Sequence, residues 1–134
     1  MSAILNTKRV VERRLSLNFP TTKISFENSN FVAPKELYLR TAFRVNRPTD
    51  DSIGNNCYLE NITFTVFVCD ELNKGTANAI TVAEQVRDLF YKRLSLLEDG
   101  TRVHILRQPQ VSTAGITTDR LIIPVVISLT VEAE

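Results

Sequence analysis

RLIIPVVISLTV, residues 120–131, decides the fold class of this chain. Hydrophobic side chains occupy every second position from Leu121 to Val131, which is the period of a β-strand with one face against a core. Many of the residues are β-branched and favour strands. Pro124 has no backbone N–H to donate, so we expect this strand either to lie at a sheet edge or to be locally bulged.

Two more stretches alternate with the same period. Residues 37–45 and 58–69 each place apolar side chains on one face, which predicts strands that lie against a core on one side. Pro48 and Gly54 lie between them, in loop-forming sequence from 46 to 56. We therefore predict an antiparallel hairpin with a long loop. Two further segments, 23–27 and 102–107, are expected to be short strands, and residues 108–118 are expected to form a polar loop.

A first helix is predicted at residues 2–17. Ile4, Val11 and Leu15 fall on one helical face, which we expect to lie against the core. Pro20 follows shortly afterwards and cannot continue the hydrogen-bond ladder, so the helix should end before it.

The clearer helical pattern lies between residues 76 and 100. Its apolar residues recur at helical spacing, and they are Val82, Val86, Leu89, Phe90, Leu94 and Leu97. Gly100 is predicted to terminate the helix. The helix begins either at Thr76 or at Thr81, because Thr81 and Glu84 have the spacing of a capping box.

The order of helix, strands, helix and strands indicates an α+β fold. We expect a mainly antiparallel sheet of about four to five strands, with two helices packed on one face. No repeat or linker divides the 134 residues, so a single domain spanning 1–134 is predicted. The hydrophobic content of 43% is enough for a core that needs no disulfide or metal.

Few residues have a pattern that indicates catalysis. His104 is the only histidine, and no partner lies at a ligand spacing from it. Two-metal and acid–base sites use paired carboxylates, but Asp50-Asp51 and Asp70-Glu71 fall in predicted turns, where aspartate caps and solvates the backbone. The four glycines are too far apart for a phosphate-binding loop. We therefore expect a protein that is not an enzyme and uses no metal or cofactor.

The charge balance argues against a protein that grips nucleic acid through a basic surface. The chain has 16 Lys and Arg and 15 Asp and Glu, and they are evenly scattered. Cys57 and Cys69 are too few for a disulfide scaffold and are expected to be reduced thiols. No segment approaches the roughly 18 apolar residues that cross a bilayer, so no membrane partner is expected.

Several short motifs follow one another in a particular order along the chain. They are Glu27-Asn28, Phe31, Pro34, Leu37-Tyr38-Leu39-Arg40, Cys57-Tyr58-Leu59-Glu60-Asn61-Ile62, Phe64-Thr65-Val66-Phe67, Lys74-Gly75, Ala83, Val86, Asp88-Leu89-Phe90, Val103-His104-Ile105, Asp119-Arg120 and Ile123-Pro124-Val125. Each motif alone is degenerate, but their order and spacing over residues 4–130 resemble a family of phage tail-terminator-like minor tail proteins. The chain departs from that family at Leu59, where a glycine is frequent, and in a final strand that ends with Ser128 and Thr130 and lacks the frequent aromatic residue.

The resemblance implies a structural role in the virion. Such proteins form a ring, commonly a hexamer, on the head-proximal end of the tail tube after assembly in the bacterial cytoplasm. The ring stops tube polymerisation and offers a surface to the head or neck proteins, and DNA passes through it without specific binding. The partners implied are thus copies of the chain itself, the tail tube protein and a head-completion or neck protein.

Two kinds of surface are predicted to make these contacts. Loops tolerate specialisation on a rigid scaffold, so the loops 47–56 and 108–118 are candidates. Their candidate contact residues are Arg47, Asp50, Asp51, Gln108 and Gln110. The second face of the sheet is another candidate subunit interface, through Arg40 and Arg44 beside Tyr38 and Phe67, unless a helix of the same chain covers it.

Two other functions stay open at this point. A head–tail connector or a tail-tube subunit can share this small α+β build. A small phage nuclease or nucleic-acid-binding protein belongs to another class, and it would show metal-dependent cleavage or salt-sensitive DNA binding.

Overall fold

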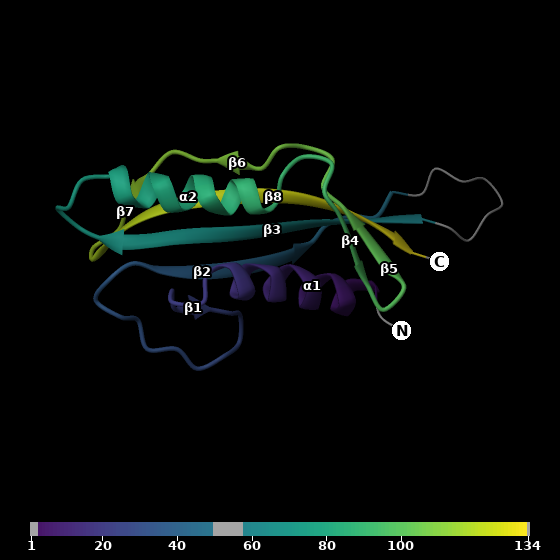
Figure 1. The fold of residues 1–134 in the computed structure, drawn as a ribbon, viewed down its shortest axis with the longest axis horizontal. Coiled ribbons are helices and arrows are strands. Elements are labelled where there is room, and N and C mark those ends of the chain that lie inside the picture. The colour runs from purple at the N-terminus through teal and green to yellow at the C-terminus, as the bar shows by residue number, and fades with distance from the viewer. Residues whose placement is uncertain (1–2, 50–57, 134) are drawn as a thin grey trace.

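The strand predicted at 120–131 is present as β8 (Arg120–Ala133), at the centre of the sheet (Figure 1). A computed structural model describes residues 3–49 and 58–133, and within these ranges the chain forms two helices and eight strands. The helices are α1 (Ala3–Asn18) and α2 (Ala77–Leu89). The other strands are β1 (Ile24–Ser25), β2 (Tyr38–Val45), β3 (Tyr58–Glu71), β4 (Ser95–Glu98), β5 (Thr101–His104), β6 (Gln110–Val111) and β7 (Gly115–Ile116).

The described strands belong to one sheet with the order β1-β2-β3-β8-β5-β4, and β6 and β7 also pair with β8. β3 and β8 are its longest strands, and they run antiparallel from the pair Tyr58 and Ala133 to the pair Glu71 and Arg120. Only the pairing of β1 with β2 is parallel among the described strands. The α+β class and the predicted β2–β3 hairpin are therefore confirmed. The strand count is higher than expected because β4 replaces part of a predicted helix and because β6 and β7 lie in the predicted loop 108–118.

Pro124 lies at an interruption in the ladder on one side of β8. Its carbonyl accepts a hydrogen bond from the Ser112 N–H at 2.8 Å, so its backbone faces β6 and β7 and not β3. Between β6 and β7, the three residues 112–114 lie opposite only Ile123 and Pro124. The missing N–H falls in this gap. The expectation of an edge strand was wrong, and the alternative of a local irregularity was right.

The helix predicted to reach Gly100 ends at Leu89, so its second half was wrong. The backbone takes a positive φ of 74° at Arg93, and the chain then forms the β4–β5 hairpin. Asp99 and Gly100 have φ values of 48° and 82°, and Asp-Gly is the residue pair that a tight hairpin turn with two positive φ angles favours. Leu97, expected on the apolar helix face, lies in β4 and is 63% exposed. The turn residues thus override an apolar spacing that matches a helix.

The other helix boundaries agree more closely with the sequence. α1 confirms the helix predicted at 2–17. α2 follows Thr76, which occupies the N-cap position, so the earlier of the two predicted starts was right. The Thr81 hydroxyl donates to the Ala77 carbonyl at 2.8 Å inside the helix and therefore does not cap it. Asp70 and Glu71, expected in a turn, are the last residues of β3.

Both helices contribute to the same buried cluster, which confirms that they pack on one face of the sheet. Alternate residues of β3 and β8 form that face. Val11 and Leu15 of α1 and Val86 of α2 have no exposed surface, and the rings of Phe64 and Phe90 meet edge to face at 5.8 Å. Neither described helix is long and apolar enough to cross a membrane.

Two buried threonines next to this core differ in their hydrogen bonding. The Thr101 hydroxyl accepts a hydrogen bond from the Asn6 amide at 2.9 Å, which joins β5 to α1. The Thr41 hydroxyl is buried and has no hydrogen-bond partner among the described residues. Burial of an unpaired hydroxyl destabilises a fold, whereas a paired one contributes net stability.

We expect Thr41→Val to raise the free energy of unfolding by about 1 kcal/mol, because the methyl group replaces an unpaired hydroxyl of similar size. The matched change Thr101→Val should lower it by about 1–3 kcal/mol, because it leaves the buried Asn6 amide without its partner. Urea denaturation followed by circular dichroism measures both values. Shifts of the same sign in the two variants would contradict this account.

Candidate functional site

The sheet face turned away from the helices is a candidate binding surface. We call it the outer face, and its residues are Arg40, Ala42, Arg44, Thr63, Thr65, Phe67, Pro124, Val126 and Ser128. Each is half-buried or exposed, while the neighbouring residues along each strand mostly point into the core. Neither described helix packs on this face, because both contribute to the core on the other side. Among the described residues, no helix of the same chain therefore covers the outer face.

Arg40 and Phe67 form a stacked pair at the centre of the outer face. They are cross-strand neighbours in β2 and β3, and the Arg40 guanidinium lies 4.3 Å from the centre of the Phe67 ring. Pro124 of β8 is the next residue along the same row. Stacking holds the guanidinium in place, and its planar fork of N–H donors suits recognition of another molecule. This row thus combines an apolar floor with a positioned positive charge.

Arg44 lies four residues beyond Arg40 in β2, opposite Thr63. Beyond that row a groove of about 280 Å³ opens at the end of the sheet. Its polar lining includes Asn46, whose amide donates to the Thr63 hydroxyl at 2.8 Å, and Ser128. Leu106 adds a side chain that is 63% exposed. The outer face therefore continues into a groove of mixed polarity.

At its opposite end the outer face is covered by the segment that leads into β2. Arg120 anchors this segment, since its guanidinium donates to the carbonyls of Pro34, Lys35 and Glu36. The same guanidinium lies 5.0 Å from the centre of the Tyr38 ring. One arginine fork thus joins two parts of the chain that are 84 to 86 residues apart.

Cys69 is buried at this covered end beside Tyr38. Burial raises the pKa of the Cys69 thiol, and burial together with the neighbouring thiol raises the pKa of the Tyr38 hydroxyl. The thiol is free, as predicted, and is held in its neutral form. Cys57 lies outside the described residues.

The structure brings together some of the predicted contact residues and separates others. Gln110 of β6 is the cross-strand neighbour of Val126, so it shares the outer face with Arg40 and Arg44. Gln108 does not, because its side chain accepts the Lys92 backbone N–H at 3.1 Å, in the turn after α2.

The remaining predicted contacts concern the loop after β2. Arg47 is exposed, and its carbonyl accepts a hydrogen bond from the Asn61 amide at 3.0 Å. Asp50 and Asp51 lie outside the described residues.

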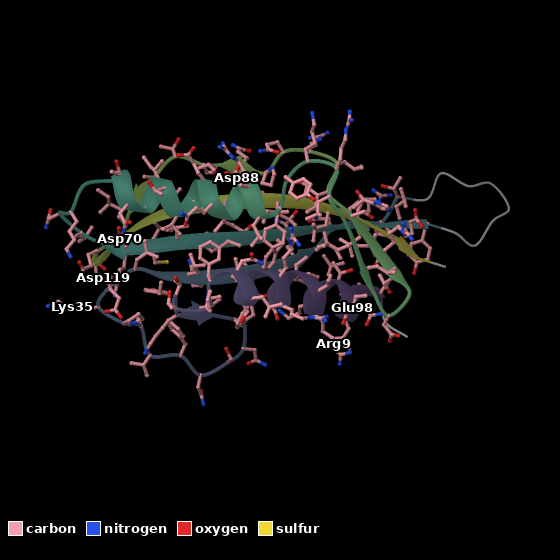
Figure 2. The ribbon with its side chains drawn as sticks, in the orientation of Figure 1. Arg9, Lys35, Asp70, Asp88, Glu98 and Asp119 are labelled. Carbon is pink, nitrogen blue, oxygen red and sulfur yellow. The ribbon has the colours of Figure 1, made fainter. Side chains whose placement is uncertain are left out.

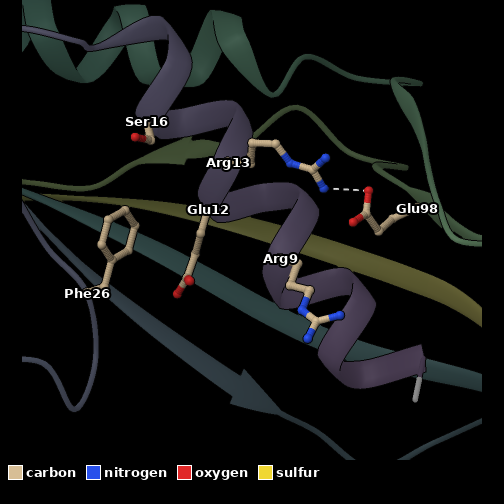
Figure 3. A pocket seen from close by; sticks show the side chains of 6 residues that line it. All are labelled: Arg9, Glu12, Arg13, Ser16, Phe26 and Glu98. Atoms are coloured by element: carbon tan, nitrogen blue, oxygen red, sulfur yellow. Dashed lines mark ion pairs between the residues drawn. The ribbon is translucent and has the colours of Figure 1, made fainter. Parts of the chain in front are cut away.

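The structure also has a charged groove along α1 that sequence reasoning missed (Figure 3). It measures about 470 Å³ and is lined by Arg9, Glu12, Arg13, Ser16, Phe26 and Glu98. The Arg13 guanidinium and the Glu98 carboxylate are 2.5 Å apart. No sequence signal linked them, because Glu98 was assigned to a helix. Figure 2 shows Arg9 and Glu98 well away from Lys35 and Asp119 along the length of the molecule.

His104 has two neighbours that the sequence did not predict. Its ring nitrogens lie 3.4 Å from the Ser95 hydroxyl and 3.4 Å from the Glu132 carboxylate. Serine, histidine and a carboxylate are the groups of a hydrolytic triad. Both distances, however, exceed the roughly 2.6–3.2 Å of a catalytic hydrogen bond. Ser95 and Glu132 are moreover solvent-exposed on the strands, so nothing excludes water from them.

The paired carboxylates Asp70 and Glu71 have structural partners. Asp70 is buried and accepts the Glu71 backbone N–H at 2.8 Å, and Glu71 forms an ion pair with Lys74 that lowers the pKa of Glu71. No group of three or more His, Cys, Asp or Glu side chains in residues 3–49 and 58–133 could hold a metal ion.

Comparisons with known proteins agree with this description. The model of a family described as "Phage tail terminator protein" matches residues 7–129. A search of the curated proteins found no match. One solved structure is similar with a TM-score of 0.73 and 19% sequence identity, over 95% of this chain and 90% of the other. At that identity the likeness concerns the fold alone.

Proposed function

Since the chain belongs to the phage tail terminator protein family, we propose that it forms a ring, a hexamer, that caps the tail tube and stops its polymerisation. The family is structural, and the chain is a structural protein of the virion tail. The other side of the ring would offer the attachment surface for a head-completion or neck protein. The family match favours this function over a connector, a tube subunit or a nuclease.

A ring is one of the two assemblies that a head-to-tail contact can give. A head-to-tail contact between identical subunits closes into a ring if its rotation returns to the start, and it grows into a filament if it does not. A terminator needs one side that fits the tube and another that accepts no further tube ring. The net charge of +1 supports the passage of DNA, because a strongly basic lumen would bind phosphate.

One observation supports the subunit contact most directly: the outer face is left uncovered by both described helices. It has the composition of an interface centre, with an aromatic ring, small apolar residues and arginines. We propose that Arg40, Arg44 and Gln110 contact the neighbouring subunit there. Arg47, Asp50, Asp51 and Gln108 would contact the tube or the neighbouring subunit outside this face.

The test is to assemble particles in cells infected with a phage that lacks a functional copy of this protein. Negative-stain images should show overlong tails without heads, because nothing ends the tube or joins it to a head. Supplying the wild-type protein from a plasmid should restore tails of uniform length. Tails of normal length joined to heads in its absence would refute the proposal, and filaments formed by the purified chain would identify a tube subunit.

A further inference from the structure

The two helices carry opposite excess charge. α1 has four basic residues and one glutamate, whereas α2 has one arginine and two carboxylates, Glu84 and Asp88. Both helices pack on the side of the sheet opposite to the outer face. Of the two described helices, only α2 therefore offers an excess of negative charge, and it lies across the sheet from Arg40 and Arg44.

Most of the exposed residues of α2 form a single stripe along the helix. We call this stripe the α2 face, and its residues are Ala77, Ile80, Thr81, Glu84 and Asp88. The Glu84 and Asp88 side chains are 52% and 72% exposed, and Figure 2 labels Asp88 on α2. Arg87 lies 3.4 Å and 3.9 Å from the two carboxylates but is only 32% exposed. The carboxylates therefore project beyond the arginine that pairs with them.

The outer face needs an acidic partner if another subunit is to cover it. Its charged residues are Arg40 and Arg44, and neither forms an ion pair with a carboxylate in residues 3–49 and 58–133. A guanidinium group that is buried without a carboxylate is strongly destabilising, because it loses its water and gains no opposite charge. A neighbour that covers this face must therefore bring carboxylates.

We propose that the α2 face of a second copy of this chain docks on the outer face, with Glu84 and Asp88 pairing with Arg40 and Arg44. The inference rests on the proposed ring and names the surface that meets the outer face in it. The two surfaces lie on opposite sides of one subunit, so the contact is head-to-tail, as a ring requires. Each subunit uses both surfaces once.

The α2 face fits the outer face in chemistry and in scale. Arg40 and Arg44 are four residues apart on a strand, about 13 Å. Glu84 and Asp88 are four residues apart on a helix, about 6 Å. The difference is within the combined reach of the long side chains. Ile80, which is 40% exposed, adds an apolar contact, and a helix laid on an open sheet face is a common layer arrangement.

Two alternative contacts fit less well. The exposed Arg9 and Arg13 of α1 would set arginine against arginine, and like charges across an interface are costly. At the free edge of β2, the Phe43 N–H already donates to Glu27 Oε1 at 2.8 Å, which disfavours the addition of a strand there. Of these three elements, the acidic helix is the one that suits the outer face best.

The test mixes two charge-reversed proteins that each lack one half of the contact. One is Arg40→Glu with Arg44→Glu, and the other is Glu84→Arg with Asp88→Arg. Alone, each sets like charges against each other at every contact, so the affinity between subunits should fall at least about 30-fold and rings should be lost. Mixed in equal amounts, the two proteins should regain rings, because every contact in an alternating hexamer then joins opposite charges. Native mass spectrometry should find equal numbers of the two subunits, which differ in mass.

A third protein controls for attraction between net charges. Glu36→Arg with Asp119→Arg gains the same positive charge at exposed positions outside both faces. It should form rings alone and should not restore rings when it is mixed with the Arg40 and Arg44 variant. Restoration by this control would overturn the proposed contact, because the position of the charge would then not matter.

Wild type and the folding of each variant are measured in parallel. Arginine is a good helix former, and Asp88→Arg places a positive charge near the C-terminus of α2, so circular dichroism should show folded proteins. If a double variant unfolds, the single changes Arg44→Glu and Glu84→Arg give the same test with half the charge. Rings in wild type but none in the mixture would refute this contact alone. A wild type without rings would refute the ring and the contact together.

Discussion

Replacing Phe64 by alanine should lower the free energy of unfolding by about 3–5 kcal/mol, the usual effect of emptying a buried aromatic site. Phe64 is fully buried in the middle of β3, and its ring meets that of Phe90, the C-cap residue of α2, edge to face at 5.8 Å. Its removal would therefore weaken the contact between sheet and helix as well as leave a cavity. Because small domains are stable by only about 5–15 kcal/mol, the loss would take a large part of the total. Urea denaturation gives the value directly.

Phe67 provides a matched control in the same strand. It is the same residue type, three positions along β3, but it lies on the outer face under Arg40 and is only half-buried. Phe67→Ala should therefore cost about 1 kcal/mol, mainly the lost stacking with Arg40 and a small burial term. If the two alanine variants were equally destabilised, the assignment of core and outer faces would be wrong.

The long strands could be predicted because their pattern is local. The alternation of apolar and polar residues in 58–69 and 120–131 predicts which side chains face the core. In the structure these side chains are buried in β3 and β8. The outer face followed from the same alternation, which placed Arg40, Arg44 and Phe67 together. A period of two fixes both faces of a strand at once, so one pattern predicted the core and the candidate interface.

The hairpin at 95–104 was missed because two local signals compete there. Leu94 and Leu97 continue the helical spacing of α2, while Asp99-Gly100 favours a tight turn between strands. The turn prevails because β5 also pairs with β8, through Val103 and His104. That pairing joins residues far apart in the sequence, and no local hydrophobic period predicts it.

The contacts that organise the candidate sites were also beyond sequence reasoning. Glu27 reaches Phe43 across 16 residues, and Arg120 reaches Lys35 across 85. The groove along α1 depends on Glu98, which was placed in the wrong element. Each contact depends on how distant strands are ordered in the sheet, and one sequence alone carries no signal of that order.

Reversing both charges on the outer face, in the double variant Arg40→Glu and Arg44→Glu, should prevent ring formation while the subunit stays folded. If the neighbouring subunit buries these guanidinium groups, charge reversal should cost about 2–5 kcal/mol or more at each contact, because a buried charge then lacks its partner. Folding should change by only about 1 kcal/mol, since Arg40 loses its stacking on Phe67 and Arg44 is exposed. Native mass spectrometry gives the subunit count, and thermal unfolding gives the stability.

The control for this variant carries the same change of charge elsewhere. Arg9 of α1 and Lys92 after α2 are exposed and belong to elements on the other side of the sheet, so Arg9→Glu with Lys92→Glu should leave the ring intact. Both double variants should also be supplied to infected cells that lack the wild-type protein, where only the control should restore tails of uniform length. Rings of wild-type affinity from the Arg40 and Arg44 variant would show that the subunit contact lies elsewhere, while loss of rings in both variants would point to net charge and not to this face. Because each result assigns the contact to a different part of the surface, the pair of variants tests the outer face itself.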